Sequence, residues 1–141
     1  MCGIAGIISP KSFALNLPAL KRMADSLVHR GPDGEGFWIN NISNAGFAHR
    51  RLAIIDLSEA AAQPMHYLDR YTIVYNGEIY NYIELRKELK KAGYHFNSGS
   101  DTEVILAAFH EWKEKCFNKF NGMWAFVIWD KNEQTLFLSR D

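Results

Sequence analysis

Residues 1–8 of the chain read MCGIAGII, an apolar segment with a cysteine directly after the first methionine. The run from residue 2 to residue 8 predicts a strand that is apolar on both faces. Such a strand needs cover on both sides, which favours a sheet packed between other layers. Residues 124–129 have the same character. Together the two segments predict two sheets that pack face to face.

Cys2 is also the first candidate for chemistry. Removal of Met1 would leave a thiol and a free α-amine on one residue. An α-amine titrates near pH ~8 and can accept the thiol proton, so that nucleophile and general base need no second side chain. The alternative is a buried structural cysteine in the first strand, because free cysteine is among the most buried residue types.

The remaining pattern predicts helices and strands in alternation. Helices are expected over residues 17–28, 80–92 and 101–114, with Asn16 and Ser100 as N-terminal caps and Gly93 as a C-terminal stop. Strands are expected over residues 2–8, 37–39, 45–52, 71–75, 124–129 and 135–139. Short turns between neighbouring strands favour the α+β class, with antiparallel pairing and the helices on the outside.

Composition restricts the class of function. The 141 residues suffice for one domain, and 16 basic residues balance 16 acidic ones, so no nucleic-acid or anionic-membrane partner is indicated. The longest apolar run, residues 123–129, is far shorter than the ~20 residues of a membrane span. No signal peptide, metal-ligand spacing or phosphate-binding glycine loop is present in the sequence. We expect a cytoplasmic, metal-free protein.

Four polar features stand where apolar strands end: Cys2, Arg50-Arg51, residues 76–78 (Asn-Gly-Glu) and Ser100-Asp101. Hydrolysis of the carboxamide of a free amino acid needs one group of each kind. A thiol attacks, and an asparagine side chain beside a glycine N–H stabilises the oxyanion. A guanidinium pairs with the α-carboxylate, and a carboxylate pairs with the α-ammonium.

Each feature also has a plainer interpretation. Asn76-Gly77 is a typical turn dipeptide, and Asp101 is an acid in the first turn of a helix. Arg50 or Arg51 is a solvated strand-end charge, and Glu78 is a loop acid. Taken singly, the plainer interpretations are favoured. Taken jointly they are hard to sustain, because all four required groups are present.

The sequence resembles the glutamine-hydrolysing asparagine synthetases. The motifs that carry the resemblance, in order, are MCGIAG (1–6), HRGPD (29–33), RLAIID (51–56), QPM (63–65), NGEIYN (76–81), SDTE (100–103) and GMWAF (122–126). They cover essentially the whole chain. Class II amidotransferases that make glucosamine phosphate or phosphoribosylamine share the N-terminal cysteine but differ around the arginine.

The resemblance implies that residues 1–141 form a class II glutamine amidotransferase domain. Its fold would be an αββα four-layer sandwich of two antiparallel sheets, of the N-terminal-nucleophile hydrolase type. Cys2 would be the nucleophile, with its own amine as base. The Asn76 side chain and the Gly77 N–H would form the oxyanion hole and contact the substrate there.

The same resemblance implies a glutamine pocket. Arg51 and Asp101 would bind the α-carboxylate and the α-ammonium of the substrate. Arg51, rather than Arg50, matches the family because it directly precedes Leu52. Backbone around Leu52 to Ile54, together with Glu78, would complete the pocket.

In the family the pattern continues past Asp141 into further strands and a separate synthetase domain. We therefore expect an amidotransferase domain that is incomplete at its C-terminus, with ATP and magnesium used only in the absent synthetase domain. The expected function is hydrolysis of glutamine to glutamate and ammonia, with the ammonia used for ATP-dependent asparagine synthesis from aspartate. The alternatives are a non-catalytic remnant or scaffold fragment, or an amidotransferase domain that serves a different acceptor.

Overall fold

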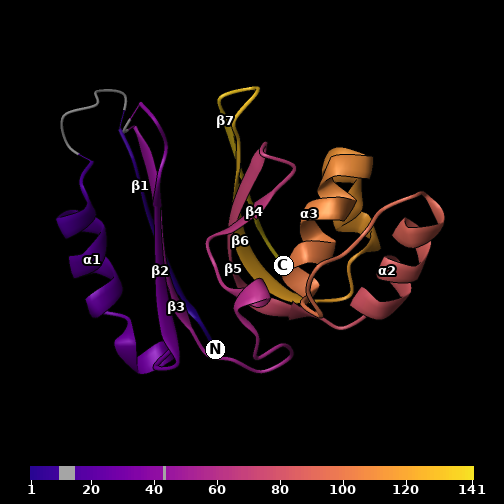
Figure 1. Cartoon of the computed structure of the whole chain (residues 1–141), viewed down its shortest axis with the longest axis horizontal. Helices are drawn as coiled ribbons and strands as arrows, with labels where there is room; N and C mark the ends of the chain where they lie inside the picture. The colour runs from indigo at the N-terminus through magenta and orange to yellow at the C-terminus, as the bar shows by residue number, and fades with distance from the viewer. Residues whose placement is uncertain (10–14, 43) are drawn as a thin grey trace.

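The computed structural model describes residues 1–9, 15–42 and 44–141. Two antiparallel sheets lie face to face, with α1 (Leu17–Asp25) outside one of them and α2 (Tyr82–Lys91) and α3 (Asp101–Trp112) outside the other (Figure 1). The expected α+β class with two antiparallel sheets is confirmed.

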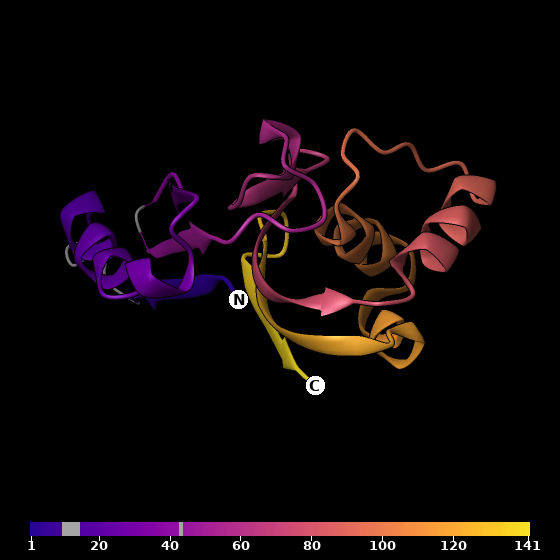
Figure 2. The ribbon, with the colours of Figure 1, turned by 90° about the horizontal axis from the view of Figure 1, so that it is seen from below.

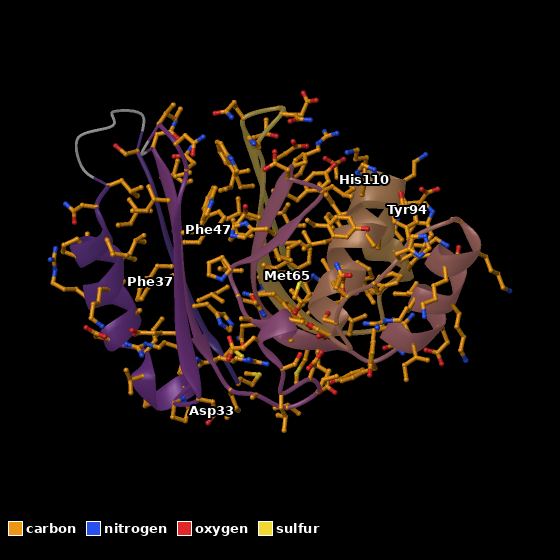
Figure 3. The ribbon with its side chains drawn as sticks, in the orientation of Figure 1. Asp33, Phe37, Phe47, Met65, Tyr94 and His110 are labelled. Carbon is orange, nitrogen blue, oxygen red and sulfur yellow. The ribbon has the colours of Figure 1, made fainter. Side chains whose placement is uncertain are left out.

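The first sheet has three strands, in the order β1, β3, β2, with bounds Gly3–Ile8, Ala45–Arg51 and Gly34–Ile39. Gly3 pairs with Arg50, so Cys2 and Arg51 fall at the same end of this sheet. The side chains of β2 and β3 alternate between its faces. Phe37 points toward α1, whereas Phe47 points toward the second sheet (Figure 3).

The helix α1 covers the outer face of the first sheet. The Asn16 side chain accepts a hydrogen bond from the Ala19 N–H at 2.9 Å, which confirms the expected cap. The helix ends at Asp25, three residues earlier than expected. At this point the Ser26 hydroxyl donates to the Met23 carbonyl, and residues 28–30 form a short 3-10 helix instead.

The second sheet has four strands, in the order β4, β5, β6, β7, with bounds Met65–Tyr67, Tyr71–Ile79, Gly122–Asp130 and Thr135–Arg140. The strand β4 was not predicted from the sequence, and β5 continues past Asn76-Gly77, where the prediction ended it. This dipeptide is not a turn, since Gly77 pairs with Trp124 within the continuous β5–β6 ladder. A Cβ at Gly77 would collide with the Met123 carbonyl, so the glycine serves a close approach of two backbones.

The helices α2 and α3 cover the outer face of the second sheet. Gly93 follows α2 with a φ of +95°, and the Tyr94 N–H donates to the Leu89 carbonyl, which confirms the expected glycine stop. Ser100 caps α3 by accepting from the Thr102 N–H at 3.0 Å. The Glu103 carboxylate does not accept a hydrogen bond from the Ser100 N–H, although its position three residues after the cap would allow this. It accepts from the N–H groups of residues 97 and 98 instead.

Phe47, Val74 and Trp129 are buried between the two sheets. The expectation that the first strand is covered along both faces is wrong at its far end. Ile8 is 52% exposed there, because β1 is an edge strand of its sheet. Leu138 on β7, an edge strand of the second sheet, is 69% exposed. Cover is complete only in the middle of the sandwich.

Figures 1 and 2 both place the N-terminus between the two sheets, close to the end of β3. The chain leaves β3 there and runs through residues 52–58 toward the second sheet. This end of the sandwich carries the candidate site.

Candidate active site

A cavity of about 140 Å³ opens at this end of the sandwich. Its wall combines the N-terminus, the end of β3, the loop of residues 52–58, the end of β5 and the first turn of α3. All of the predicted site residues line it, namely Cys2, Arg51, Leu52, Ile54, Asn76, Gly77, Glu78 and Asp101. The fold therefore brings together groups that lie far apart in the sequence.

Cys2 is half-buried, and its thiol lies against the backbone of Leu52. The Leu52 N–H donates to Sγ at 3.3 Å, and Sγ is 3.6 Å from the Leu52 carbonyl oxygen. Arg30 of the HRGPD motif fixes the cysteine backbone, since its Nε donates to the Cys2 carbonyl at 3.1 Å. The thiol is thus held at the wall of the cavity, at the point where the first sheet ends.

Arg51 shares the inner face of β3 with His49 and also lines the cavity. Its Nη2 donates to the carbonyl oxygens of Asp56 and Ser58, the latter at 3.0 Å. A guanidinium has five N–H donors, so these two bonds leave capacity for a carboxylate. Arg51 therefore supports the 52–58 loop from within.

Two carboxylates also hold the 52–58 loop: Asp33, outside the cavity, and Asp56, in its wall. Asp33, at the same end of the molecule (Figure 3), accepts from the Ala53 N–H at 2.9 Å. Asp56 accepts from the Gly99 N–H at 2.6 Å and so ties the loop to the segment before α3. Hydrogen bonds from Ser58, with a smaller contribution from Gly99, lower the pKa of Asp56. The loop is a built wall of the site.

Asn76 faces the first sheet, because it is two residues beyond Val74, which lies in the core between the sheets. Its Oδ1 is buried and has no hydrogen-bond partner among the described residues. A buried amide oxygen without a donor is costly, and such groups concentrate at functional sites. Gly77 and Glu78 follow on the same strand and line the same cavity.

Asp101 is the first residue of α3 and is only 5% exposed. Its Oδ2 accepts from the Tyr75 hydroxyl at 2.8 Å and from the Ile79 N–H at 3.0 Å. Burial raises the pKa of Asp101 above its ordinary value, and these two hydrogen bonds oppose that rise because they favour the ionised form. The site therefore contains a buried carboxylate held from β5.

Two further residues of the cavity wall, Gln63 and His49, were not predicted as site residues. Gln63, in the QPM motif, accepts from the Tyr75 N–H at 2.6 Å and donates to the Thr102 hydroxyl at 3.3 Å. His49 is 1% exposed, and neither ring nitrogen reaches a hydrogen-bond partner among the described residues. Its position two residues before Arg51 was the available signal, since both share one face of a strand.

Burial lowers the pKa of His49 to about 4, and the Tyr75 backbone opposes this effect only partly. The imidazole is therefore neutral near pH 7. Within the described residues, no group of three His, Cys, Asp or Glu side chains is arranged to hold a metal ion. Nor does the described part of the chain contain a helix that is long and apolar enough to cross a membrane.

Comparison with known families adds the decisive observation. Residues 1–141 match the model of the glutamine amidotransferase domain. The chain belongs to this family. It is a class II glutamine amidotransferase domain that resembles the N-terminal part of asparagine synthetases.

Two relatives of the amidotransferase domain are asparagine synthetases (glutamine-hydrolyzing) 1 and 3 of Bacillus subtilis (strain 168). They are 46% and 43% identical to it, and each match covers 100% of this chain but only 22% and 23% of the relative. The chain thus spans about a fifth of the length of these relatives.

The fold of the domain also occurs in a solved structure. The glutamine phosphoribosylpyrophosphate amidotransferase of B. subtilis, complexed with ADP and GMP, matches with a TM-score of 0.74. The match covers 100% of this chain and 37% of that one, at 18% sequence identity. At this identity the similarity shows the shared fold alone.

Proposed function

We propose that this domain hydrolyses glutamine to glutamate and ammonia with Cys2 as the nucleophile. In the full-length protein the ammonia would serve ATP-dependent synthesis of asparagine from aspartate. The observation that carries the proposal is the convergence of Cys2, Arg51, Asn76 and Asp101 on one cavity. A thiol, a cation, an amide and an anion together match the groups of glutamine.

The reaction requires that Met1 has been removed, because a Cys2 nitrogen in peptide linkage is not basic. The free amine accepts the thiol proton while Sγ attacks the side-chain carbonyl of glutamine. The amine then returns the proton to the leaving nitrogen. The C–N bond breaks, ammonia departs, and a γ-glutamyl thioester on Cys2 remains. Water, deprotonated by the same amine, hydrolyses the thioester to glutamate and restores the thiol. The Leu52 N–H, 3.3 Å from Sγ, stabilises negative charge on sulfur.

The negative charge on the attacked oxygen is assigned to the Asn76 carboxamide N–H and the Gly77 N–H. The loss of one such donor typically lowers kcat by about 10²–10³-fold. The buried Asn76 Oδ1 supports this role. It has no hydrogen-bond partner among the described residues, so no contact of this oxygen explains why a carboxamide stands here, whereas a need for its N–H donor does.

Selectivity for glutamine is assigned to the charged groups of the cavity. Arg51 would pair with the α-carboxylate and Asp101 with the α-ammonium. Backbone of Leu52 and Ile54, with the Glu78 side chain, would close the pocket around the rest of the substrate. The Asp101 carboxylate, whose Oδ2 accepts two hydrogen bonds that favour its ionised form, supports this assignment.

The asparagine synthetase relatives support a wider context for the domain. We place the domain in the cytoplasm, with a C-terminal synthetase domain as its partner and glutamine as its substrate. The domain itself would need no cofactor, and ATP and magnesium would act only in the synthetase domain. The αββα sandwich is assigned to the N-terminal-nucleophile hydrolase class, with further strands following Asp141. The similarity to the phosphoribosylpyrophosphate amidotransferase fold supports this assignment.

The proposal is tested by ammonia release from glutamine, with asparagine as a control substrate. The chain lacking Met1 is expected to release ammonia from glutamine and much less from asparagine, whose shorter side chain leaves the carboxamide out of reach of Sγ. A folded chain without Met1 that releases no ammonia and binds glutamine poorly or not at all would support the non-catalytic alternative. The full-length protein tests the choice of acceptor. Amination of a compound other than aspartate, with glutamine as the nitrogen donor, would support the alternative acceptor.

A further inference from the structure

We infer that Tyr75 is a positioning residue that sets the preference of the site for substrates with an α-ammonium group. Its hydroxyl holds one oxygen of the Asp101 carboxylate so that the other is presented to the substrate. This inference rests on the proposed function and deepens it.

The two oxygens of Asp101 are not equivalent. Oδ2 accepts from the Tyr75 hydroxyl at 2.8 Å and from the Ile79 N–H at 3.0 Å. Asp101 nevertheless lines the open cavity. Since both donors from β5 bind Oδ2, we assign Oδ1 to the ammonium group of the substrate. The hydroxyl therefore fixes the χ2 torsion angle of Asp101, whose distribution is broad without such a contact.

Tyr75 is well suited to hold a fixed position. It is buried in the core that joins the second sheet to α3. Its N–H donates to Gln63 Oε1 at 2.6 Å, and Gln63 Nε2 donates to the Thr102 hydroxyl at 3.3 Å. Gln63 thus links Tyr75 to the residue directly after Asp101. This link fixes the position of the Tyr75 ring on β5 relative to the Asp101 carboxylate on α3.

The hydroxyl also remains a donor under all ordinary conditions. Burial, followed by the negative charge of Asp101, raises the pKa of Tyr75 far above its usual value. Asp101 must be ionised to pair with an ammonium group, while its burial favours the neutral form. A donor that is always protonated offsets this cost at one oxygen and leaves the other free. Loss of the hydroxyl should therefore weaken binding of the α-ammonium specifically.

The test compares two amide substrates in Tyr75→Phe. Glutamine carries the α-ammonium, and glutaric acid monoamide has the same chain length and carboxamide without it. In the variant, kcat/KM for glutamine is expected to fall about tenfold, mainly through KM, while kcat/KM for the monoamide changes less than twofold. Asp101→Asn should bring the two substrates to similar values of kcat/KM.

Tyr71→Phe is the matched control. Tyr71 is also buried on β5, but its hydroxyl accepts from Lys113 at 2.7 Å and lies away from the cavity. It should keep the wild-type preference for glutamine. Tyr75→His, which restores a ring N–H donor, tests the inference independently if Tyr75→Phe does not fold. Its preference should lie between that of the wild type and that of Asp101→Asn.

Equal losses of kcat/KM for both amides in Tyr75→Phe would overturn the inference, because a general structural role predicts them. An unchanged preference in both Tyr75 variants, or an equal loss of preference in Tyr71→Phe, would overturn it as well. A wild-type chain that hydrolyses neither amide would contradict the proposed function itself. The inference about Tyr75 would then also fail. The two failures are distinguishable, because this one is seen in the wild-type chain before any variant is measured.

Discussion

Sγ of Cys2 and the backbone N–H of Leu52 lie 3.3 Å apart, across the gap between the start of β1 and the end of β3. Leu52 directly follows Arg51, the proposed ligand of the substrate α-carboxylate. Nucleophile and substrate anchor are thus joined through one peptide unit. A displacement of the 52–58 loop would move both, which makes the loop a sensitive part of the site.

Cys2→Ala is predicted to abolish glutamine hydrolysis and to change the free energy of unfolding by only about 0.5 kcal/mol. The thiol is half-buried at the cavity wall, so its loss leaves little void. Cys116→Ala is the matched control. This thiol is buried in the core, and burial raises its pKa to about 12, which makes it a poor nucleophile. We expect full activity and a loss of about 1–2 kcal/mol of stability, measured by ammonia release and denaturant unfolding.

Arg51→Ala and Arg50→Ala are predicted to have different effects. Arg50 pairs with Asp25 and Glu35 on the outer side of the first sheet, away from the cavity. Arg51→Ala should lower kcat/KM for glutamine about 100-fold, equivalent to about 2.7 kcal/mol. Arg50→Ala should keep kcat/KM within about threefold and lose about 1 kcal/mol of stability, because both carboxylates that pair with Arg50 are exposed. A larger kinetic loss in Arg50→Ala would reverse the assignment.

His49 predicts a pH dependence of stability. Its pKa is lowered from 6.5 to about 4 in the folded state, so the unfolded chain takes up a proton there first. This contribution to the free energy of unfolding is complete above pH 6.5 and decreases as the pH falls toward 4, by at most about 1.4 kcal/mol per pH unit. The raised pKa of Asp101 acts in the opposite direction, and the lowered pKa values of His66 and His110 act in the same direction.

The contribution of His49 is isolated by His49→Gln. The free energy of unfolding, measured in denaturant between pH 4 and 7, should fall less steeply with acidification in the variant than in the wild type. Parallel pH profiles for the two proteins would show that His49 is protonated as easily in the folded state as in the unfolded chain.

Gly77→Ala and Gly93→Ala test the two backbone roles of glycine. At Gly77 a Cβ would meet the Met123 carbonyl in the neighbouring strand, so the β5–β6 ladder must open. We predict a loss of more than about 2 kcal/mol of stability, together with loss of activity. At Gly93 nothing lies near the added Cβ, and the cost of about 1 kcal/mol comes only from its φ of +95°. Equal melting temperatures for the two variants would contradict this distinction.

The sequence predicted the sheets and helices well where local patterns dominate. The caps at Asn16 and Ser100 and the stop at Gly93 depend on neighbouring backbone, and all three were correctly predicted. Asn76-Gly77 was assigned to the end of a strand because this dipeptide is typical of turns. The tertiary contact of Gly77 with β6 overrides that preference. No local signal carries such a contact.

The candidate site shows the same division. Each of its predicted residues belongs to a short motif and lines the cavity, while their catalytic roles stay predictions. Tyr75 and His49 were not predicted as site residues. In the sequence Tyr75 directly precedes Asn76, and His49 is two residues before Arg51. Their positions depend on which face of β5 and β3 meets α3 or the opposite sheet. That information comes from the packing of distant segments.

The central claim is that Cys2 carries a covalent γ-glutamyl group during turnover, and that this requires a free amine. The most direct measurement is the mass of the protein after acid quenching of a reaction with glutamine, on chains with and without Met1. The chain without Met1 is predicted to gain the mass of one γ-glutamyl group on the peptide that contains Cys2, and the chain with Met1 to gain none. Turnover without this adduct in acid-quenched samples across the time course, or equal activity in the chain that retains Met1, would contradict the account.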